Sequence, residues 1–302
     1  MNNEKPSLVF FGSGPVAAES LRLLANTFSI EVVITKPTTE QEMNLACPGA
    51  PVFTVNNRSE LDDLMESNAF SSVCAVLIDF GIIVSQKVID CFPKGIINSH
   101  FSLLPEWRGA DPITFSILSG QEKTGVSLMM LVEAMDEGPL LAQSTYDIEP
   151  DETTTSLTES LIDLSYQSIV TVLPLWLDNE IEYAPQESVT IAQNTIPTYS
   201  RKLTKGDGII DWQKPAVQLE REVRAYVGWP KSRTNLSGVD CVITKASVSE
   251  ESGVAGELLI EAKRLGVYCA QGCLIIERLK PAGKNEMDAR SFINGYINKL
   301  NA

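Results

Sequence analysis

The sequence predicts an α/β fold with a parallel sheet covered by helices on both faces, followed by a small β-barrel. Three observations support this prediction. Short apolar runs alternate with helical patterns in the first part, a polar stretch with two prolines follows, and strand patterns punctuated by glycines fill the rest. We therefore expect a first domain at residues 1–183, a linker at 184–198 and a second domain at 199–302.

The first domain is built from alternating strand and helix patterns. Short apolar or β-branched runs predict strands at Ser7–Phe11, Ile30–Thr35, Val73–Ile78, Gly95–Ser99 and Gly125–Val132. Apolar spacing of three and four predicts helices at Ala17–Leu24, Leu61–Ser67, Gln86–Cys91, Pro112–Ser119 and Ser156–Leu177. Alternation of this kind implies a Rossmann-like parallel sheet between two helical layers.

The second domain has short strands and little helix. Strand patterns lie at Val239–Thr244, Glu257–Glu261, Gly266–Cys269 and Cys273–Leu279, with one helical pattern near Ala216–Tyr226. Several short strands separated by glycines are typical of a small barrel of the OB type.

Composition excludes several classes of protein. The six cysteines form no CxxC pair and His100 is the single histidine, so we expect no metal site. The N-terminus has one short apolar run before a glycine, which argues against a secretory signal. No apolar stretch approaches the roughly 20 residues of a membrane span, so we expect no membrane partner. Scattered cysteines without a signal fit a reducing, cytoplasmic location.

Charge is distributed unevenly along the 302 residues. The net charge of −15 argues against nucleic acid as a partner of the whole chain. Residues 1–190 hold 27 acidic and 8 basic side chains, whereas residues 191–302 hold 12 acidic and 16 basic ones. The second part is therefore open to an anionic partner, although solvated surface charge explains the same numbers.

The first glycine cluster matches a dinucleotide-binding pattern. Gly12, Gly14 and Ala17 fit GxGxxA between a strand and a helix. Such a site also needs an acidic residue at the end of the second strand, where this chain has Thr35 and Lys36. A tight turn without a nucleotide explains the glycines at least as well.

Polar residues of types that act in catalysis follow the later predicted strands. Asn98 and His100 are two residues apart at the end of a predicted strand, so both side chains point to one side. Asp136 follows the next predicted strand, and ligands bind beyond the carboxyl ends of parallel strands. An amide donor, an imidazole with a pKa of about 6.5 in isolation and a carboxylate suit acyl transfer between two nitrogens. A buried histidine of purely structural role is the alternative.

These residues belong to a longer pattern. It comprises Asn98-Ser99-His100, Ser102–Pro105 (SLLP), Arg108-Gly109 and the distant Asp136, with Phe80-Gly81 upstream. The pattern resembles the signature of the 10-formyltetrahydrofolate-dependent formyltransferases. Tyr199–Trp212, Arg224–Pro230 and Leu279–Gly295 look like the C-terminal domain of family members that act on methionyl-tRNA, so the resemblance covers nearly the whole chain.

The resemblance implies a monomeric enzyme that moves the formyl group of 10-formyltetrahydrofolate onto the amine of initiator methionyl-tRNA. It implies catalytic roles for Asn98, His100 and Asp136. The implied folate pocket consists of Phe80, Gly81, Ser102, Leu103, Leu104 and Pro105. The C-terminal barrel would contact tRNA through Arg201, Lys202, Lys205 and Arg224, with Arg221, Lys231 and Arg233 as further candidates.

The chain departs from the family where the acceptor end of tRNA is recognised. The usual long basic loop after the second strand is replaced by Lys36–Gly49, which carries Glu40 and Glu42. Glu106 and Asp111 add further negative charge. Three alternatives therefore stay open: a sugar-amine N-formyltransferase, a nicotinamide-dependent oxidoreductase, and a tRNA-binding protein without activity.

Overall fold

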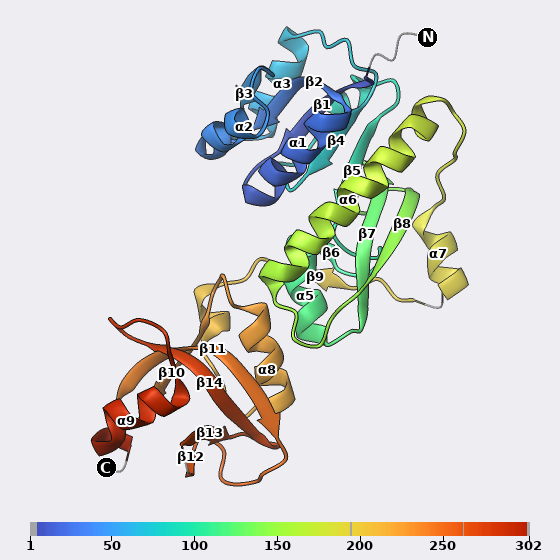
Figure 1. Cartoon of the computed structure of the whole chain (residues 1–302). Coiled ribbons are helices and arrows are strands. Elements are labelled where there is room, and N and C mark those ends of the chain that lie inside the picture. Colours follow the sequence, from blue (N-terminus) through green and yellow to red (C-terminus); the bar gives the residue numbers. More distant parts are fainter. Residues whose placement is uncertain (1–4, 194, 262, 301–302) are drawn as a thin grey trace. The chain divides into compact units, whose positions relative to one another are not determined.

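The computed structural model describes residues 5–193, 195–261 and 263–300, which form two compact units (Figure 1). The first unit runs up to Pro112 and adds Lys123–Asp147 and Thr158–Arg201. The second unit combines Ile113–Glu122 and Ile148–Leu157 with the chain from Lys202 onward. The units are therefore interleaved along the sequence, and we describe each by itself.

The first unit contains a seven-stranded sheet in the order β3-β2-β1-β4-β5-β7-β8. Its strands are β1 (Ser7–Gly12), β2 (Ser29–Thr35), β3 (Val52–Thr54), β4 (Ala75–Ile78), β5 (Ile96–His100), β7 (Lys123–Met130) and β8 (Leu140–Asp147). The five predicted strands are confirmed, while β3 and β8 were not predicted. The first five strands in this order pair in parallel, as expected, but β5–β7 and β7–β8 are antiparallel.

Helices cover both faces of this sheet. They are α1 (Pro15–Thr27), α2 (Glu40–Ala46, after the short 3-10 helix η1, Pro37–Thr39), α3 (Arg58–Ser67), α4 (Gln86–Asp90) and α6 (Thr154–Leu177). Residues of α3 and α4 share one apolar cluster with β1, β2 and β4. On the opposite face, α6 bonds to β5 through Ser165 and Ser99, and to α1 through Tyr166 and Thr27 (Figure 1).

The turn between β1 and α1 needs its glycines for packing and backbone geometry. A Cβ on Gly12 would lie 2.9 Å from the carbonyl oxygen of Ile78, and Gly14 has a φ of 91°. Pro15 then starts α1 at a position where its missing N–H costs nothing. The GxGxxA pattern is therefore explained without a nucleotide.

The reversal of β7 decides where the following loop starts. Ile97 pairs with Met130 and His100 pairs with Ser127, so β7 ends beside the beginning of β5. Residues 131–139 connect β7 to β8 and carry Asp136. The rule for parallel strands, which we used to place Asp136 at the carboxyl edge, does not apply to this loop.

Helix α6 is long and apolar enough to cross a membrane by length and composition, although no such stretch was predicted. It has 24 residues and a window with a mean hydropathy of 1.2. Its Leu161 and Leu173 are fully buried, and Ser165 bonds to the sheet. These contacts are those of a core helix.

The segment predicted as a linker, 184–198, contains regular structure. Helix α7 spans Gln186–Gln193, and Ala184 forms a β-bridge with Leu140. Beyond it, β9 (Tyr199–Ser200) pairs in parallel with β6 (Arg108–Gly109). Gln186 is only 2% exposed. Tertiary hydrogen bonds, together with packing of Val189 against Leu104, Met129 and Leu140, hold this segment in place.

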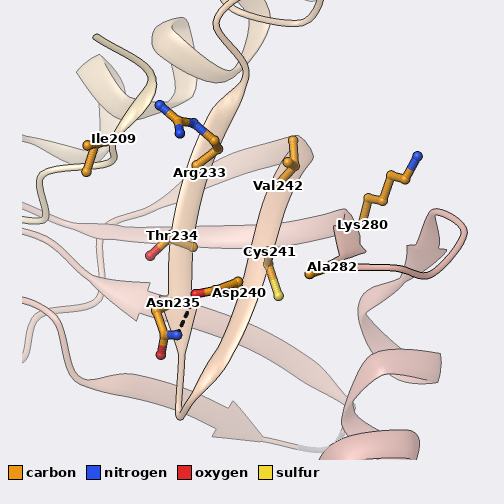
Figure 2. A pocket seen from close by; sticks show the side chains of 9 residues that line it. All are labelled: Ile209, Arg233, Thr234, Asn235, Asp240, Cys241, Val242, Lys280 and Ala282. Atoms are coloured by element: carbon orange, nitrogen blue, oxygen red, sulfur yellow. Dashed lines mark hydrogen bonds between the residues drawn. The ribbon is translucent and has the colours of Figure 1, made fainter. Parts of the chain in front are cut away.

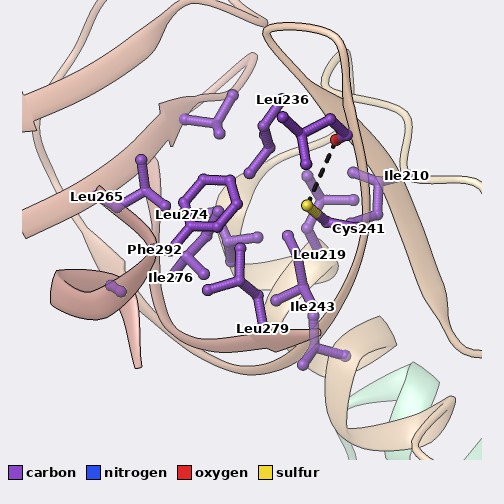
Figure 3. Close-up of a cluster of buried hydrophobic side chains, with 14 of the residues drawn as sticks. Ile210, Leu219, Leu236, Cys241, Ile243, Leu265, Leu274, Ile276, Leu279 and Phe292 are labelled. Carbon is purple, nitrogen blue, oxygen red and sulfur yellow. Dashed lines mark hydrogen bonds between the residues drawn. The ribbon is translucent and has the colours of Figure 1, made fainter. Parts of the chain in front are cut away.

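The second unit is an antiparallel sheet around one core (Figure 3). Its strands are β10 (Ser232–Leu236), β11 (Val239–Ser249), β12 (Leu258–Glu261), β13 (Arg264–Tyr268), β14 (Cys273–Pro281) and β15 (Met287–Asp288). The helices are α5 (Pro112–Ser119), α8 (Ala216–Ala225) and α9 (Ala289–Leu300), with the 3-10 helix η2 (Lys205–Gly208). The predicted strands and α8 are confirmed, whereas β10, β15 and α9 were not predicted. Phe292 of α9 is fully buried in this core.

Candidate active site

The centre of the candidate site is formed by alternate residues of β5. Asn98 and His100 are each 7% exposed and point to one side of the strand. Ser99, between them, points to the other side and bonds to Ser165 of α6 at 2.7 Å. The predicted side-by-side placement of the amide and the imidazole is therefore confirmed.

Both nitrogens of the His100 ring face oxygen atoms. Nε2 donates to the carbonyl oxygen of Trp107 at 3.0 Å. Nδ1 lies 3.8 Å from Oδ1 of Asp136, which is within the range of an ion pair but longer than a hydrogen bond. The Trp107 carbonyl, which sequence reasoning missed, thus fixes the ring and leaves Nδ1 toward Asp136.

Asp136 reaches this position because residues 131–139 fold back over the sheet. Its Oδ2 accepts a hydrogen bond from the backbone N–H of Gly109 at 2.8 Å, and its φ is 53°. The next residue, Glu137, forms an ion pair with the buried Arg108 at 3.0 Å. The trio of Asn98, His100 and Asp136 therefore meets through loop contacts, and not through strand order.

The Asn98 side chain is available to form a hydrogen bond with a ligand. Within the residues that the structure describes, its amide makes no hydrogen bond, yet its atoms are not fully sealed from solvent. An amide that is nearly buried gains free energy from a partner of complementary polarity. Asn98 can therefore donate to an oxygen that develops negative charge above the strand.

The segment Ser102–Pro105 is anchored by polar residues of β7 and β8. Ser127 Oγ accepts from the Leu104 N–H at 2.9 Å and donates to the Ser102 carbonyl at 2.6 Å. Gln143 Nε2 donates to the Leu104 carbonyl at 2.8 Å. Ser102 and Leu104 are fully buried, and Leu103 is partly exposed. In this segment, Leu103 is the residue whose side chain a ligand can reach.

Phe80 and Gly81 follow β4 and differ in exposure. Phe80 is 1% exposed and packs edge-on against Phe11 in the core, with ring centroids 5.5 Å apart. Gly81 is exposed and has a φ of 65°. A Cβ there would lie 2.7 Å from Lys36 Nζ. Phe80 therefore shapes the turn, and Gly81 is the residue of the two that a ligand can reach.

The basic residues of the C-terminal part fall into two groups. Arg201, Lys202 and Lys205 are exposed. Arg224, by contrast, forms an ion pair with Glu220 at 2.6 Å and donates to the Glu152 carbonyl at 2.8 Å. To reach a phosphate, Arg224 would have to give up these contacts.

A shallow groove of about 490 Å³ lies on the β10–β11–β14 face of the second unit (Figure 2). Arg233 pairs with Val242, which in turn pairs with Lys280, so two cations flank one apolar residue. Burial raises the pKa of the Cys241 thiol in this groove to about 11, so the thiol is not a nucleophile at neutral pH. The groove therefore offers two cations and one carboxylate, that of Asp240, but no reactive thiol.

The described residues contain no group of three or more His, Cys, Asp or Glu side chains that could hold a metal ion. Gln186, by contrast, is a functional candidate that the sequence did not indicate. It contacts both Arg108 and the Asp136 loop, although it lies 50 residues from Asp136 in the chain. A polar residue in an aperiodic segment gives no local signal of such a contact.

Comparison with known families matches both parts of the chain. Residues 13–173 match the family described as Formyl transferase. Residues 202–297 match the family described as Formyl transferase, C-terminal domain.

Two curated relatives with the same name match nearly the whole length of this chain. A methionyl-tRNA formyltransferase from Myxococcus xanthus is 32% identical over 304 residues, which cover 97% of this chain and 96% of the relative. A protein of the same name from Pseudomonas putida is 32% identical over 308 residues, covering 98% and 97%.

Solved structures of lower identity share the fold. A sugar 3N-formyl transferase has a TM-score of 0.68 at 18% identity and covers 94% of this chain and all of its own. HypX from Aquifex aeolicus in complex with tetrahydrofolic acid has a TM-score of 0.63 at 15% identity, covering 96% of this chain and 47% of its own.

Proposed function

The chain belongs to the formyl transferase family, and from this premise we propose that it transfers the formyl group of 10-formyltetrahydrofolate to the amine of initiator methionyl-tRNA. The first domain, residues 1–183, carries the reaction. The second, residues 199–302, holds the tRNA. We further propose that the enzyme is a cytoplasmic monomer and that it binds no membrane. The contacts of α6 with the sheet support the last of these proposals.

Each member of the trio has a role in this reaction. The amine nitrogen of methionine attacks the formyl carbon, and the bond from that carbon to the folate nitrogen then breaks. Asn98 donates to the oxyanion that forms between these steps. His100 and Asp136 carry the proton that leaves the amine toward the folate nitrogen, with Nδ1 as the ring nitrogen beside the carboxylate.

The observation that carries this proposal is the position on one strand of an amide without a hydrogen-bond partner among the described residues and an imidazole that faces a carboxylate. Formyl donor binding is assigned to backbone atoms and side chains of the turns at Phe80, Gly81, Ser102, Leu103, Leu104 and Pro105. The Asn98 amide is nearly buried and has no partner in the described part of the chain, so it is available to the formyl oxygen of the bound donor.

For tRNA, we propose contacts from Arg201, Lys202 and Lys205, together with Arg233 and Lys280 of the groove (Figure 2). Within the second unit, Arg233 donates to the Lys205 carbonyl, so these two cations adjoin each other. Arg224 joins this set only if Glu220 releases it.

A second acceptor, an amino sugar nucleotide, is favoured by one observation. Helix α2 places Glu40 and Glu42 in its first turn, where a tRNA-binding segment would carry basic residues. Negative charge there repels the phosphates of tRNA but tolerates a smaller acceptor.

One assay distinguishes the acceptors. Purified protein is incubated with 10-formyltetrahydrofolate and either charged initiator tRNA, charged elongator tRNA or an amino sugar nucleotide, and the formylated product is quantified by mass spectrometry. We expect product with initiator tRNA. Product only with the sugar would replace the proposed acceptor, and no product with any of them would refute formyl transfer.

A further inference from the structure

Gln186 uses the whole hydrogen-bonding capacity of its side chain inside the first unit. Its Oε1 accepts from Arg108 at 2.7 Å (Nη2) and 3.3 Å (Nε). Its Nε2 donates to the carbonyl oxygens of Asp136 at 2.9 Å and Gly138 at 2.8 Å. An amide has two donor hydrogens and one oxygen with two lone pairs, so these contacts fill it.

The residues that Gln186 contacts are those that bring Asp136 to His100. Strand order leaves the 131–139 loop at the opposite end of β5, so its return depends on contacts outside the sheet. Arg108 holds Glu137, and the next residue, Gly109, binds the Asp136 carboxylate. Gln186 bonds to both sides of this arrangement, to Arg108 and to the carbonyls of the loop.

The backbone of the loop is strained where Gln186 binds it. Asp136 has a φ of 53°, in the left-handed region, which costs a non-glycine residue free energy unless contacts around it compensate. A Cβ on Gly138 would lie 1.8 Å from the Met130 carbonyl oxygen, so the loop lies tightly against β7. Two hydrogen bonds from one buried amide provide such contacts.

We infer that Gln186 is a positioning residue that sets the distance between the Asp136 carboxylate and the His100 ring. This inference rests on the proposed formyl transfer for its effect on activity. Gln186 touches no reacting atom. It acts by holding the carbonyls of Asp136 and Gly138 in place through one amide that is itself fixed by Arg108.

The first test compares three variants. Gln186→Met keeps the volume and removes all four hydrogen bonds. Gln186→Glu keeps the acceptor for Arg108 but, as a carboxylate, cannot donate to the loop carbonyls. We expect both to lower kcat about 10- to 100-fold, because small displacements of catalytic groups have effects of this size, with KM for the formyl donor little changed. Glu187→Ala, at the exposed neighbour on α7, should have no effect.

Gln186→Glu also separates two roles of the residue. If Gln186 were only an anchor for Arg108, the carboxylate would pair well with the guanidinium and kcat would stay near the wild-type value. Retained kcat in this variant would overturn the inference.

A double mutant asks whether Gln186 acts through Asp136. In an Asp136→Asn background, Gln186→Met should cause little further loss of kcat, because the carboxylate that it positions is already gone. Losses that multiply would mean that Gln186 supports the fold in general, and would contradict the inference.

A measurement without turnover keeps this test separate from the proposed function. His100 is the single histidine, so its ring gives one set of NMR signals. In Gln186→Met, these signals should move toward those of Asp136→Asn, while Glu187→Ala leaves them unchanged. Unmoved ring signals in a folded Gln186→Met protein would overturn the inference even if the wild type formylated another acceptor or none.

Discussion

Asn98 and His100 differ in the polar partners that the folded chain gives their side chains. The His100 ring is held between the Trp107 carbonyl and Asp136, whereas the Asn98 amide has no partner among the described residues. A strand fixes both side chains before substrate arrives, so little ordering is left for the reaction step. The sequence predicted the pair because alternate residues of a strand share one side.

His100→Ala should lower kcat by about 10²- to 10⁴-fold, the usual contribution of a group that transfers protons. Binding of the folate donor should remain, since the pocket is assigned to other residues. Turnover is measured with methionyl-tRNA, and donor affinity by calorimetry. Wild-type turnover in this variant would remove His100 from the mechanism.

Glu106 predicts a pH dependence of stability at the residue scale. Burial raises the pKa of its carboxyl group. The unfolded state therefore releases this proton at a lower pH than the folded state, and stability falls as the pH rises above the unfolded pKa of about 4.3. Glu106→Gln removes the penalty, so its Tm should exceed that of the wild type at pH 7.5 and match it at pH 4.

Thermal unfolding at the two pH values checks this expectation. Glu182→Gln, at an exposed position, serves as the control and should match the wild type at both. An equal Tm for Glu106→Gln and wild type at pH 7.5 would mean that the Glu106 carboxylate is well solvated.

At the scale of elements, strand direction separates what was predictable from what was not. Alternating patterns predicted β1, β2, β4, β5 and β7, but direction is not encoded in the apolar pattern of a single strand. Reversal of β7 moved its following loop to the opposite end of β5. The strand rule grouped Asp136 with His100 for a reason that the reversal of β7 removes, and the family resemblance grouped the same two residues independently. The two side chains do lie together, 3.8 Å apart.

Helix α9 is the element that completes the core of the second unit. Its Phe292 is fully buried among the core side chains and stacks on Tyr296 with ring centroids 4.7 Å apart. Phe292→Ala should lower the free energy of unfolding by about 3–5 kcal/mol, since it leaves a large cavity. Urea unfolding followed by tryptophan fluorescence measures this loss, because Trp212 packs against the same core.

Asn294 lies on the exposed side of α9. Asn294→Ala is therefore the control for the effect of an alanine in this helix. It should change the free energy of unfolding by less than about 0.5 kcal/mol. A similar loss in both variants would indicate that α9 contributes as a helix and not through its buried aromatic ring.

At the scale of the whole molecule, charge separates the two parts of the chain. Residues 1–190 carry a net −19 and residues 191–302 a net +4. A polyanion such as tRNA is therefore attracted to the second part and repelled by most of the first. The acidic first turn of α2 adds to that repulsion, and it makes the groove cations important for the proposed binding.

The affinity for initiator tRNA should fall as salt rises, by about 0.9 in log affinity per log salt for each phosphate contact. Lys280→Ala should reduce this slope by about one contact. Fluorescence anisotropy at several salt concentrations measures it. Lys299→Ala, an exposed lysine outside the groove, should leave the slope unchanged, and an unchanged slope in Lys280→Ala would remove the groove from the tRNA surface.

The sequence by itself determined the fold class, most strands, the same-side placement of Asn98 and His100, and the family. These depend on local patterns and on motifs of short spacing, which a single sequence displays. Only the tertiary structure decided the direction of β7, the folded-back loop and the contacts of Gln186. Such features depend on hydrogen bonds between residues 27 to 78 positions apart, whose energies leave no trace in local periodicity.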